Sequence, residues 1–136
     1  MKILIVEDDF DCRHLIQVYL KNHGECFVAC NGYEAVAAFE TAHEQNSSYD
    51  LICLDISMPG MDGHEALKRI RQIEKNSGIA GPDCVKVIMT TAINDRQSII
   101  DAFFEEGCEA YIVKPLKKQK LLEEIEKLGL PCEASS

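Results

Sequence analysis

The chain has 136 residues, of which 46% are hydrophobic and 27% charged, and its formal net charge is −9 at pH 7. This length suits one domain, and the composition is typical of a soluble globular domain, which excludes a disordered or collagen-like chain. The negative charge disfavours nonspecific contact with nucleic acid or an anionic membrane. Acidic residues follow the first aliphatic run, 3–6, at once, so we expect no signal peptide, no membrane insertion and a cytoplasmic protein.

The seven cysteines include no CxxC pair, and most of them lie within hydrophobic segments. This pattern favours free thiols in a reducing compartment over a disulfide or metal framework. Cys132, in the polar tail, is the cysteine that we expect to be exposed. Neither His43 nor His64 has a second histidine at the spacing of a zinc-protease motif, so the four histidines are interpreted as surface residues.

The first half of the chain alternates between strand and helix patterns. Short apolar runs predict strands at 2–6, 26–30 and 50–54, and the third, continuously apolar in its middle, is expected to be central in a sheet covered on both faces. The first helix has apolar residues at helical spacing and Gly24 as a left-handed cap; its apolar residues are Cys12, Leu15, Ile16, Tyr19 and Leu20. The apolar face of the second helix consists of Ala35, Phe39 and Ala42.

The second half continues the alternation. Asp62 is expected to cap a third helix, with Glu65 as its capping-box partner, and the inner stripe of this helix is Ala66, Leu67, Ile70 and Ile73. Residues 74–84 are interpreted as a loop, and strands are predicted at 85–90 and 110–113. A fourth helix is expected from Asp95 to Gly107, with Ile99 and Phe103 on its apolar face. A fifth helix is expected over 117–128.

Five strand–helix units in this length imply an α/β fold with a parallel five-stranded sheet and helices on both faces. The predicted domain spans residues 1–128. Residues 129–136 have no pattern and are expected to form a loose tail.

Polar residues follow several of the predicted strands at the same end. Glu7 and Asp8 follow the first strand, Asp55 the third, Thr91 the fourth and Lys114 the fifth. Ligands of open α/β sheets bind at the carboxyl ends of the strands, so these side chains are expected to form one site. Clustered carboxylates favour a hard divalent cation such as Mg²⁺, and a carboxylate in such a site is able to attack phosphorus. Asp55 is the expected nucleophile because it ends the most buried strand.

Each of these residues also has a simpler interpretation. Asp8 and Asp9 are suited to cap the first helix and to favour its dipole. The other residues are common in ordinary strand-end, surface and helix-start positions; these are Asp55, Thr91, Lys114 and Pro115. Taken together, the simpler interpretations have to account for several coincidences of placement at one edge.

Four segments resemble the motifs of the receiver domain of two-component response regulators, and the resemblance covers residues 1 to about 128. The segments are ILIVEDD at 3–9, LDISMPGMDG at 54–63, VIMTTA at 87–92 and AYIVKP at 110–115. The resemblance implies a flavodoxin-like, doubly wound sheet of order 2-1-3-4-5 with five helices. Departures from the pattern are a Glu-Asp acidic pair where Asp-Asp is common, and a long loop after the third helix.

The resemblance also implies a role for each site residue. Asp55 is the phosphoacceptor, Glu7 and Asp8 are the acidic pair, and the Ser57 backbone carbonyl completes the Mg²⁺ ligands with Asp8 and Asp55. The residues expected to contact the phosphoryl group or to respond to it are Thr91, Tyr111 and Lys114. The Lys114–Pro115 peptide bond is often cis in such domains. A histidine kinase or histidine phosphotransfer protein is the expected donor, and output is expected through a protein contact on the face formed by the fourth helix, fifth strand and fifth helix.

Three functions are compatible with this pattern. The first is a signalling module that accepts a phosphoryl group and has no separate substrate, so it is not an enzyme in the usual sense. The second is a Mg²⁺-dependent phosphohydrolase with an aspartyl phosphate intermediate; haloacid dehalogenase-like enzymes need a general-acid Asp two positions after the nucleophile, where this chain has Ser57. The third is a scaffold that keeps the fold without the chemistry, which the complete set of site residues disfavours.

Overall fold

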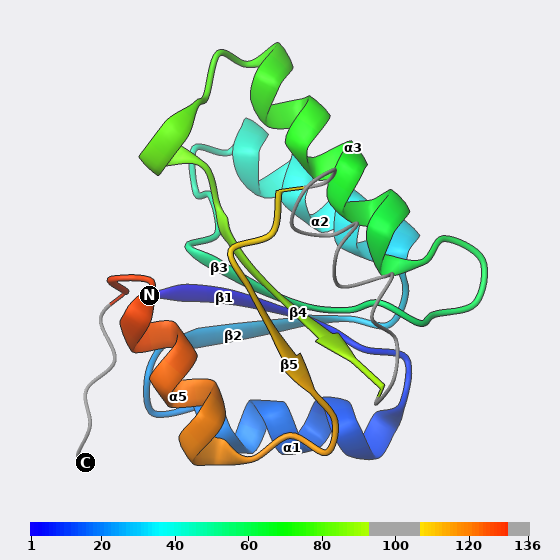
Figure 1. The fold of residues 1–136 in the computed structure, drawn as a ribbon. Coiled ribbons are helices and arrows are strands. Elements are labelled where there is room, and N and C mark those ends of the chain that lie inside the picture. The colour runs from blue at the N-terminus through cyan, green and yellow to red at the C-terminus, as the bar shows by residue number, and fades with distance from the viewer. Residues whose placement is uncertain (93–106, 131–136) are drawn as a thin grey trace.

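A parallel five-stranded sheet forms the centre of the computed structural model, which describes residues 1–92 and 107–130 (Figure 1). The strand order is β2-β1-β3-β4-β5, as the resemblance implied. The strands are β1 (Lys2–Val6), β2 (Glu25–Ala29), β3 (Leu51–Asp55), β4 (Lys86–Thr91) and β5 (Ala110–Val113). Each predicted strand lies within one residue of an observed one. The sheet is therefore of the doubly wound, flavodoxin-like class.

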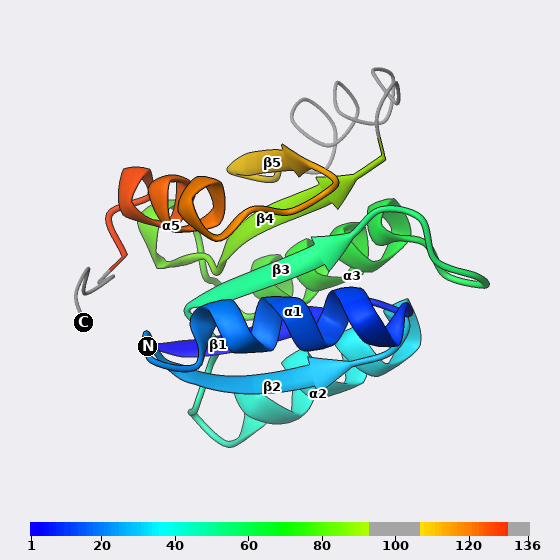
Figure 2. The same cartoon turned by 90° about the horizontal axis from the view of Figure 1, so that it is seen from below.

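Helices cover both faces of the sheet. The described residues contain α1 (Phe10–Leu20), α2 (Gly32–Glu44), α3 (Gly63–Asn76), the short 3-10 helix η1 (Gly81–Asp83) and α5 (Lys118–Lys127). The pair α1 and α5 lies on one face, and α2 and α3 pack side by side on the other (Figures 1 and 2). The fourth helix predicted from Asp95 falls outside the described residues. No helix in the described ranges is both long and apolar enough to cross a membrane.

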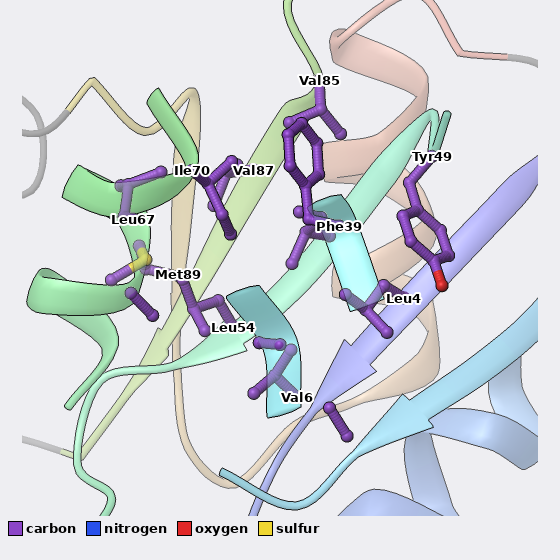
Figure 3. Packing of buried hydrophobic residues seen from close by; sticks show 14 of the residues in the cluster. Leu4, Val6, Phe39, Tyr49, Leu54, Leu67, Ile70, Val85, Val87 and Met89 are labelled. Carbon is purple, nitrogen blue, oxygen red and sulfur yellow. The ribbon is translucent and has the colours of Figure 1, made fainter. Parts of the chain in front are cut away.

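Two buried clusters, one on each face of the sheet, hold these layers together. Alternation along each strand divides the side chains: in β1, Leu4 and Val6 belong to the α2–α3 side, whereas Ile3 and Ile5 belong to the α1–α5 side. Figure 3 shows the α2–α3 side, where Phe39 and Leu67 pack over the central strands. All five residues of β3 are buried, as expected for a central strand covered on both faces.

Two helix ends differ from the sequence-based expectation. Gly24 does not adopt the left-handed conformation; α1 ends at Lys21 with right-handed helical backbone. Glycine is required at position 24 because a Cβ there would overlap the backbone oxygen of Met1. The predicted loop 74–84 is also shorter, since α3 extends to Asn76 and buries Glu74. The Glu74 carboxylate accepts hydrogen bonds from the Arg71 guanidinium (2.8 Å) and the Val85 amide (2.7 Å).

Burial of the other predicted residues follows the helical spacing with some exceptions. The expected faces of α2 and α3 are buried, apart from the half-buried Ile73, but Leu15 of α1 is exposed. The six described cysteines are free thiols, as expected; Cys30 is nevertheless exposed. Of the four histidines His14 is exposed and the other three are partly exposed, so none of them is a core residue. Cys132 lies outside the described residues.

Candidate functional site

The polar residues predicted to share one edge of the sheet occur at its carboxyl end. Asp55 and Thr91 are the last residues of β3 and β4, so each belongs to the strand rather than to the turn after it. Glu7 and Asp8 directly follow β1, and Lys114 directly follows β5. Because β1, β3, β4 and β5 are neighbouring parallel strands, their carboxyl ends meet along one line.

Lys114 brings two of these strand ends together. Its ammonium nitrogen lies 2.7 Å from Glu7 Oε1 and 3.3 Å from Asp55 Oδ1. The backbone amide of Lys114 also donates to the Thr91 carbonyl at 2.7 Å, which ties the residue to the end of β4. The Lys114–Pro115 peptide bond is cis, as expected. The lysine thus supplies a fixed positive charge between two carboxylates.

Glu7 is the most enclosed acid of the site, with 1% of its surface exposed. Its carboxylate accepts a hydrogen bond from the Asp9 amide at 3.2 Å, in addition to the bond from Lys114. Burial by itself raises the pKa of Glu7, but the hydrogen bonds from Lys114 and Asp55 outweigh it and lower the pKa to about 2. Glu7 is therefore the carboxyl group of this pair that stays ionised.

Asp55 has the opposite electrostatic balance. Burial raises its pKa, the neighbouring negative charge of Glu7 raises it further, and Lys114 only partly compensates, so that the pKa is about 7. Two carboxyl groups that share one lysine thus have pKa values shifted in opposite directions, and Asp55 is the one that binds a proton more readily. Any further cation that enters the site would stabilise the ionised form of Asp55.

Three oxygen ligands are grouped closely enough to hold a small cation. One carboxylate oxygen from each of Glu7, Asp8 and Asp55 lies within 4.8 Å of the other two. Asp8 is exposed, whereas Glu7 and Asp55 are buried, so the group is open to solvent on one side only. Carboxylate oxygens with room for water are the ligands that suit Mg²⁺, and the residues present therefore fit this metal.

The turn between β3 and α3 is held close to Asp55. The Ser57 amide donates to Asp55 Oδ1 at 3.3 Å, and the Gly63 amide donates to the Ile56 carbonyl at 2.8 Å. A side chain at position 63 would overlap the Asp55 carbonyl oxygen, so only glycine permits this approach. Asp62 caps α3 by accepting from the Glu65 amide at 3.0 Å, as predicted, while the Glu65 carboxylate accepts from Arg69.

The two residues expected to respond to a phosphoryl group occupy different surroundings. Thr91 is buried, and its hydroxyl donates to the Ala92 carbonyl at 3.3 Å. Tyr111 lies on β5 with its surface 38% exposed, and it lines a pocket between β5 and α5 together with Val113, Lys120 and Glu124. Their roles remain predictions.

The first turn of α1 decides between the two acids suited to cap it and adds contacts of Cys12 and Arg13 that the sequence reasoning missed. Asp9, not Asp8, is the N-cap of α1, and its carboxylate accepts from the Cys12 amide at 2.9 Å. Arg13 donates to the Glu7 carbonyl oxygen at 2.9 Å. Burial, together with contact with the Glu7 carboxylate, raises the pKa of the Cys12 thiol to about 12. The available signal was the position of Arg13 in the first turn after the acidic residues.

Comparisons with known proteins agree with this geometry. The family model described as response regulator receiver domain matches residues 3–126. The chemotaxis protein CheY of Bacillus subtilis is 34% identical over 131 residues, which cover 93% of this chain and 95% of that protein.

Solved structures with the same fold include two complexes. The yeast (Saccharomyces cerevisiae) receiver domain of Ssk1, co-crystallised with the histidine phosphotransfer protein Ypd1, superposes with a TM-score of 0.80 at 29% identity, covering 95% of this chain and 88% of that one. The receiver domain of the Arabidopsis thaliana histidine kinase CKI1, complexed with Mg²⁺ and BeF₃⁻, gives a TM-score of 0.79 at 27% identity over 94% and 89% of the two chains. The chain belongs to the family of response regulator receiver domains, the CheY-like phosphoacceptors of two-component signalling.

Proposed function

We propose that this receiver domain accepts a phosphoryl group on Asp55 in a Mg²⁺-dependent reaction and thereby switches a protein-binding surface. The observation that carries the proposal is the Lys114 ammonium, placed within 3.3 Å of Asp55 and 2.7 Å of Glu7 beside three grouped carboxylates. This arrangement places an acceptor oxygen next to fixed positive charge at a solvent-facing edge, which is what phosphoryl transfer to a carboxylate requires.

The transfer forms one bond and breaks one. An Asp55 carboxylate oxygen attacks the phosphorus of a donor's phosphohistidine, a P–O bond forms, and the P–N bond breaks with its electron pair left on the imidazole. Asp55 must be ionised for the attack, because only the carboxylate is a nucleophile, so a proton bound by its raised pKa leaves first. The Lys114 ammonium lies 3.3 Å from Asp55 Oδ1, so we assign it to neutralise the phosphoryl oxygens.

The metal ligands in this proposal are Asp8, Asp55 and the Ser57 carbonyl, with Glu7 adjacent. Mg²⁺ bound there would offset the negative charge of the acceptor and of the transferred group. Glu7 already accepts hydrogen bonds from Lys114 and Asp9, and its side chain is one methylene longer than the usual Asp. We therefore assign Glu7 to act through a bound water, and Asp8 to be a direct ligand.

The proposal is tested by phosphorylation with a small donor. Acetyl phosphate and Mg²⁺ are added to the intact protein, and intact-mass spectrometry measures the adduct. We expect a single phosphoryl group that is stable in acid and labile in base, as an acyl phosphate is, and that is absent when Mg²⁺ is removed with EDTA.

Two variants locate the adduct. Asp55→Asn should abolish it, whereas Asp62→Asn, which keeps a side-chain oxygen at the cap of α3, should be phosphorylated like the unmodified chain. An adduct of equal yield in Asp55→Asn would overturn the assignment. Sustained release of phosphate from small phosphate esters would favour the phosphohydrolase instead, although Ser57 offers no general acid for it.

The donor is proposed to be a histidine kinase or a histidine phosphotransfer protein. The similarity to a receiver domain crystallised with such a transfer protein supports this choice. The site lies at the carboxyl edge of the sheet, where Asp8 is exposed to solvent, so we propose that the donor histidine approaches from that edge. We also propose a cytoplasmic location, because the domain has to share a compartment with such a donor.

Output is proposed to pass through β5, α5 and the segment between β4 and β5, which lies largely outside the described residues. In this proposal a phosphoryl oxygen on Asp55 accepts a hydrogen bond from the Thr91 hydroxyl, which in the structure donates to the Ala92 carbonyl. Movement of Thr91 would alter the end of β4, whose neighbour β5 carries exposed Tyr111. A ligand shifts such a two-state element only through the contacts that differ between states, here those of Thr91 and Lys114.

Beryllofluoride, a non-hydrolysable stand-in for the phosphoryl group, tests this coupling. Amide and Tyr111 ring chemical shifts are measured with and without it, in the unmodified protein and in Thr91→Ala. The shifts should spread from Asp55 to residues 91–118 only in the unmodified protein. An equal spread in both proteins would contradict the coupling through Thr91.

A further inference from the structure

We infer that Arg13 is a positioning residue for the metal site: it holds the backbone that directs Asp8 toward the other carboxylates. This inference rests on the proposed function only in that the site is taken to bind Mg²⁺. Arg13 lies in the first turns of α1, and its guanidinium donates to the Glu7 carbonyl oxygen at 2.9 Å. That carbonyl belongs to the peptide unit that joins Glu7 to Asp8.

Asp8 depends on its backbone for its direction. In residues 1–92 and 107–130 its carboxylate has no hydrogen-bond or ion-pair partner, although one of its oxygens lies within 4.8 Å of ligand oxygens of Glu7 and Asp55. Asp8 and the ionised Glu7 carry like charges, which disfavour their close approach, so the position of Asp8 has to be held. Glu7 and Asp55 are buried and contact Lys114, but Asp8 is exposed, so we infer that the constraint on Asp8 comes through the main chain.

The main chain around Asp8 is fixed on both sides. Before it, the Glu7 amide donates to the Ala29 carbonyl at 3.1 Å, and Arg13 binds the Glu7 carbonyl. After it, the Asp9 amide donates to the Glu7 carboxylate at 3.2 Å, and the Asp9 carboxylate caps α1. Among these contacts, the one from Arg13 holds the peptide unit between residues 7 and 8 through a side chain. A mutation of Arg13 therefore changes this contact directly.

An aromatic ring holds the Arg13 guanidinium in place. The guanidinium carbon lies 5.5 Å from the centre of the Phe10 ring, which stacks in parallel with the His14 ring at 6.0 Å. Phe10 is 67% exposed, so packing in the core does not hold its ring, and its ring contacts are those with Arg13 and His14. A cation over an aromatic face is such a contact, and the guanidinium stacks well because it is planar.

Charge and position have opposite effects on Mg²⁺ affinity, which makes the inference testable. If Arg13 were only a positive charge near the site, its removal would strengthen the binding of a cation. If Arg13 positions Asp8, its removal weakens binding despite the gain in negative charge. Groups that orient metal ligands typically change affinity by about 10- to 100-fold, so the positioning effect should outweigh the charge effect.

The experiment measures the Mg²⁺ dissociation constant by isothermal titration calorimetry on the full chain. We expect Arg13→Gln to weaken binding about tenfold, Arg13→Lys to weaken it less, and Phe10→Ala to weaken it about two- to fivefold. Arg69→Gln removes the same charge from an exposed pair with Glu65 on α3 and should leave the constant unchanged. Amide shifts of the metal-free variants should change at residues 7–9, while the melting temperature of each variant shows that it is folded.

Equal or tighter Mg²⁺ binding by Arg13→Gln would overturn the positioning role and leave the proposed function standing. A loss of affinity in Arg69→Gln as large as that in Arg13→Gln would also overturn it, because the effect would then follow net charge. If Arg13→Gln does not fold, unchanged affinity in Phe10→Ala is the result that overturns the inference. An unmodified chain that binds no Mg²⁺ would instead overturn the proposed function.

Discussion

Lys114 compensates a buried carboxylate, and its removal should cost stability in the metal-free protein. Glu7 is 1% exposed and depends on the lysine for its strongest hydrogen bond, at 2.7 Å. Lys114→Met leaves this charge without a cation and should destabilise the fold by about 1–3 kcal/mol. The double variant Lys114→Met, Glu7→Gln should recover most of the loss, because a neutral amide needs no counter-charge. Urea denaturation in EDTA measures each variant.

Lys120→Met serves as the control for that cycle. Its ammonium is exposed to solvent and lies 2.9 Å from Glu124 of α5; because solvent screens such a charge, removing it should cost little stability. If the two single variants lost the same stability, the Glu7–Lys114 pair would behave as an ordinary surface pair. No recovery in the double variant would show that the loss comes from packing of the lysine stem.

Residue types at strand ends were sufficient to group most of the site, because parallel strands bring their carboxyl ends together whatever the details of packing. Asp55, Glu7 and Lys114 could therefore be predicted to meet. The role of Asp9 as N-cap, with Asp8 left free, could not be assigned, since both acids suit the position chemically. Arg13 was missed because its acceptor is a backbone carbonyl, and its position in the first turn after the acidic residues does not by itself identify that acceptor.

Arg71 connects three elements at the end of the sheet opposite the candidate site. Its guanidinium donates to Glu74 within α3 (2.8 Å), to the Val85 carbonyl before β4 (2.8 Å) and to Glu109 before β5 (3.0 Å). Arg71→Leu leaves the buried Glu74 carboxylate without its cation, and should destabilise the protein by about 3–5 kcal/mol. Chemical denaturation monitored by far-ultraviolet circular dichroism is the measurement.

Arg69, two residues earlier on the same helix, provides a matched comparison. It pairs with Glu65, and both side chains of this pair are about half exposed, so Arg69→Leu should change stability by less than about 1 kcal/mol. If the two variants lost similar stability, the hydrogen bonds of Arg71 would contribute no more to stability than an exposed ion pair. The comparison keeps the helix, the residue type and the charge change constant.

Element boundaries were predictable where periodicity decides them and not where distant contacts do. The strands could be placed to within one residue because each is a short apolar run. Glu74 appeared to begin a loop, since two glycines and a proline follow it; the structure keeps it in α3 because Arg71 and the Val85 amide satisfy its charge. Gly24 was interpreted as a helix cap, but its requirement comes from Met1, which is distant in sequence.

Charge crowding and metal binding connect the site to the stability of the whole molecule. The chain carries a net charge of −9, and three of its acids share one edge with a single described lysine among them. Asp8→Ala thins this cluster, so the metal-free variant should be at least as stable as the unmodified chain. The crowding of these acids follows from the parallel topology, which brings the carboxyl ends of the strands together whatever charge they carry.

Added Mg²⁺ should reverse that ranking. A ligand that binds only the folded state stabilises it by about 2.7 kcal/mol at a hundredfold excess over its dissociation constant, so the unmodified chain should gain this amount and Asp8→Ala little or none. Thermal unfolding by calorimetry, with EDTA and then with Mg²⁺, measures both. Asp83→Ala, an equal charge change at exposed η1, should gain like the unmodified chain. A full gain in Asp8→Ala would place the metal elsewhere, because the domain would then be stabilised through ligands that do not include Asp8.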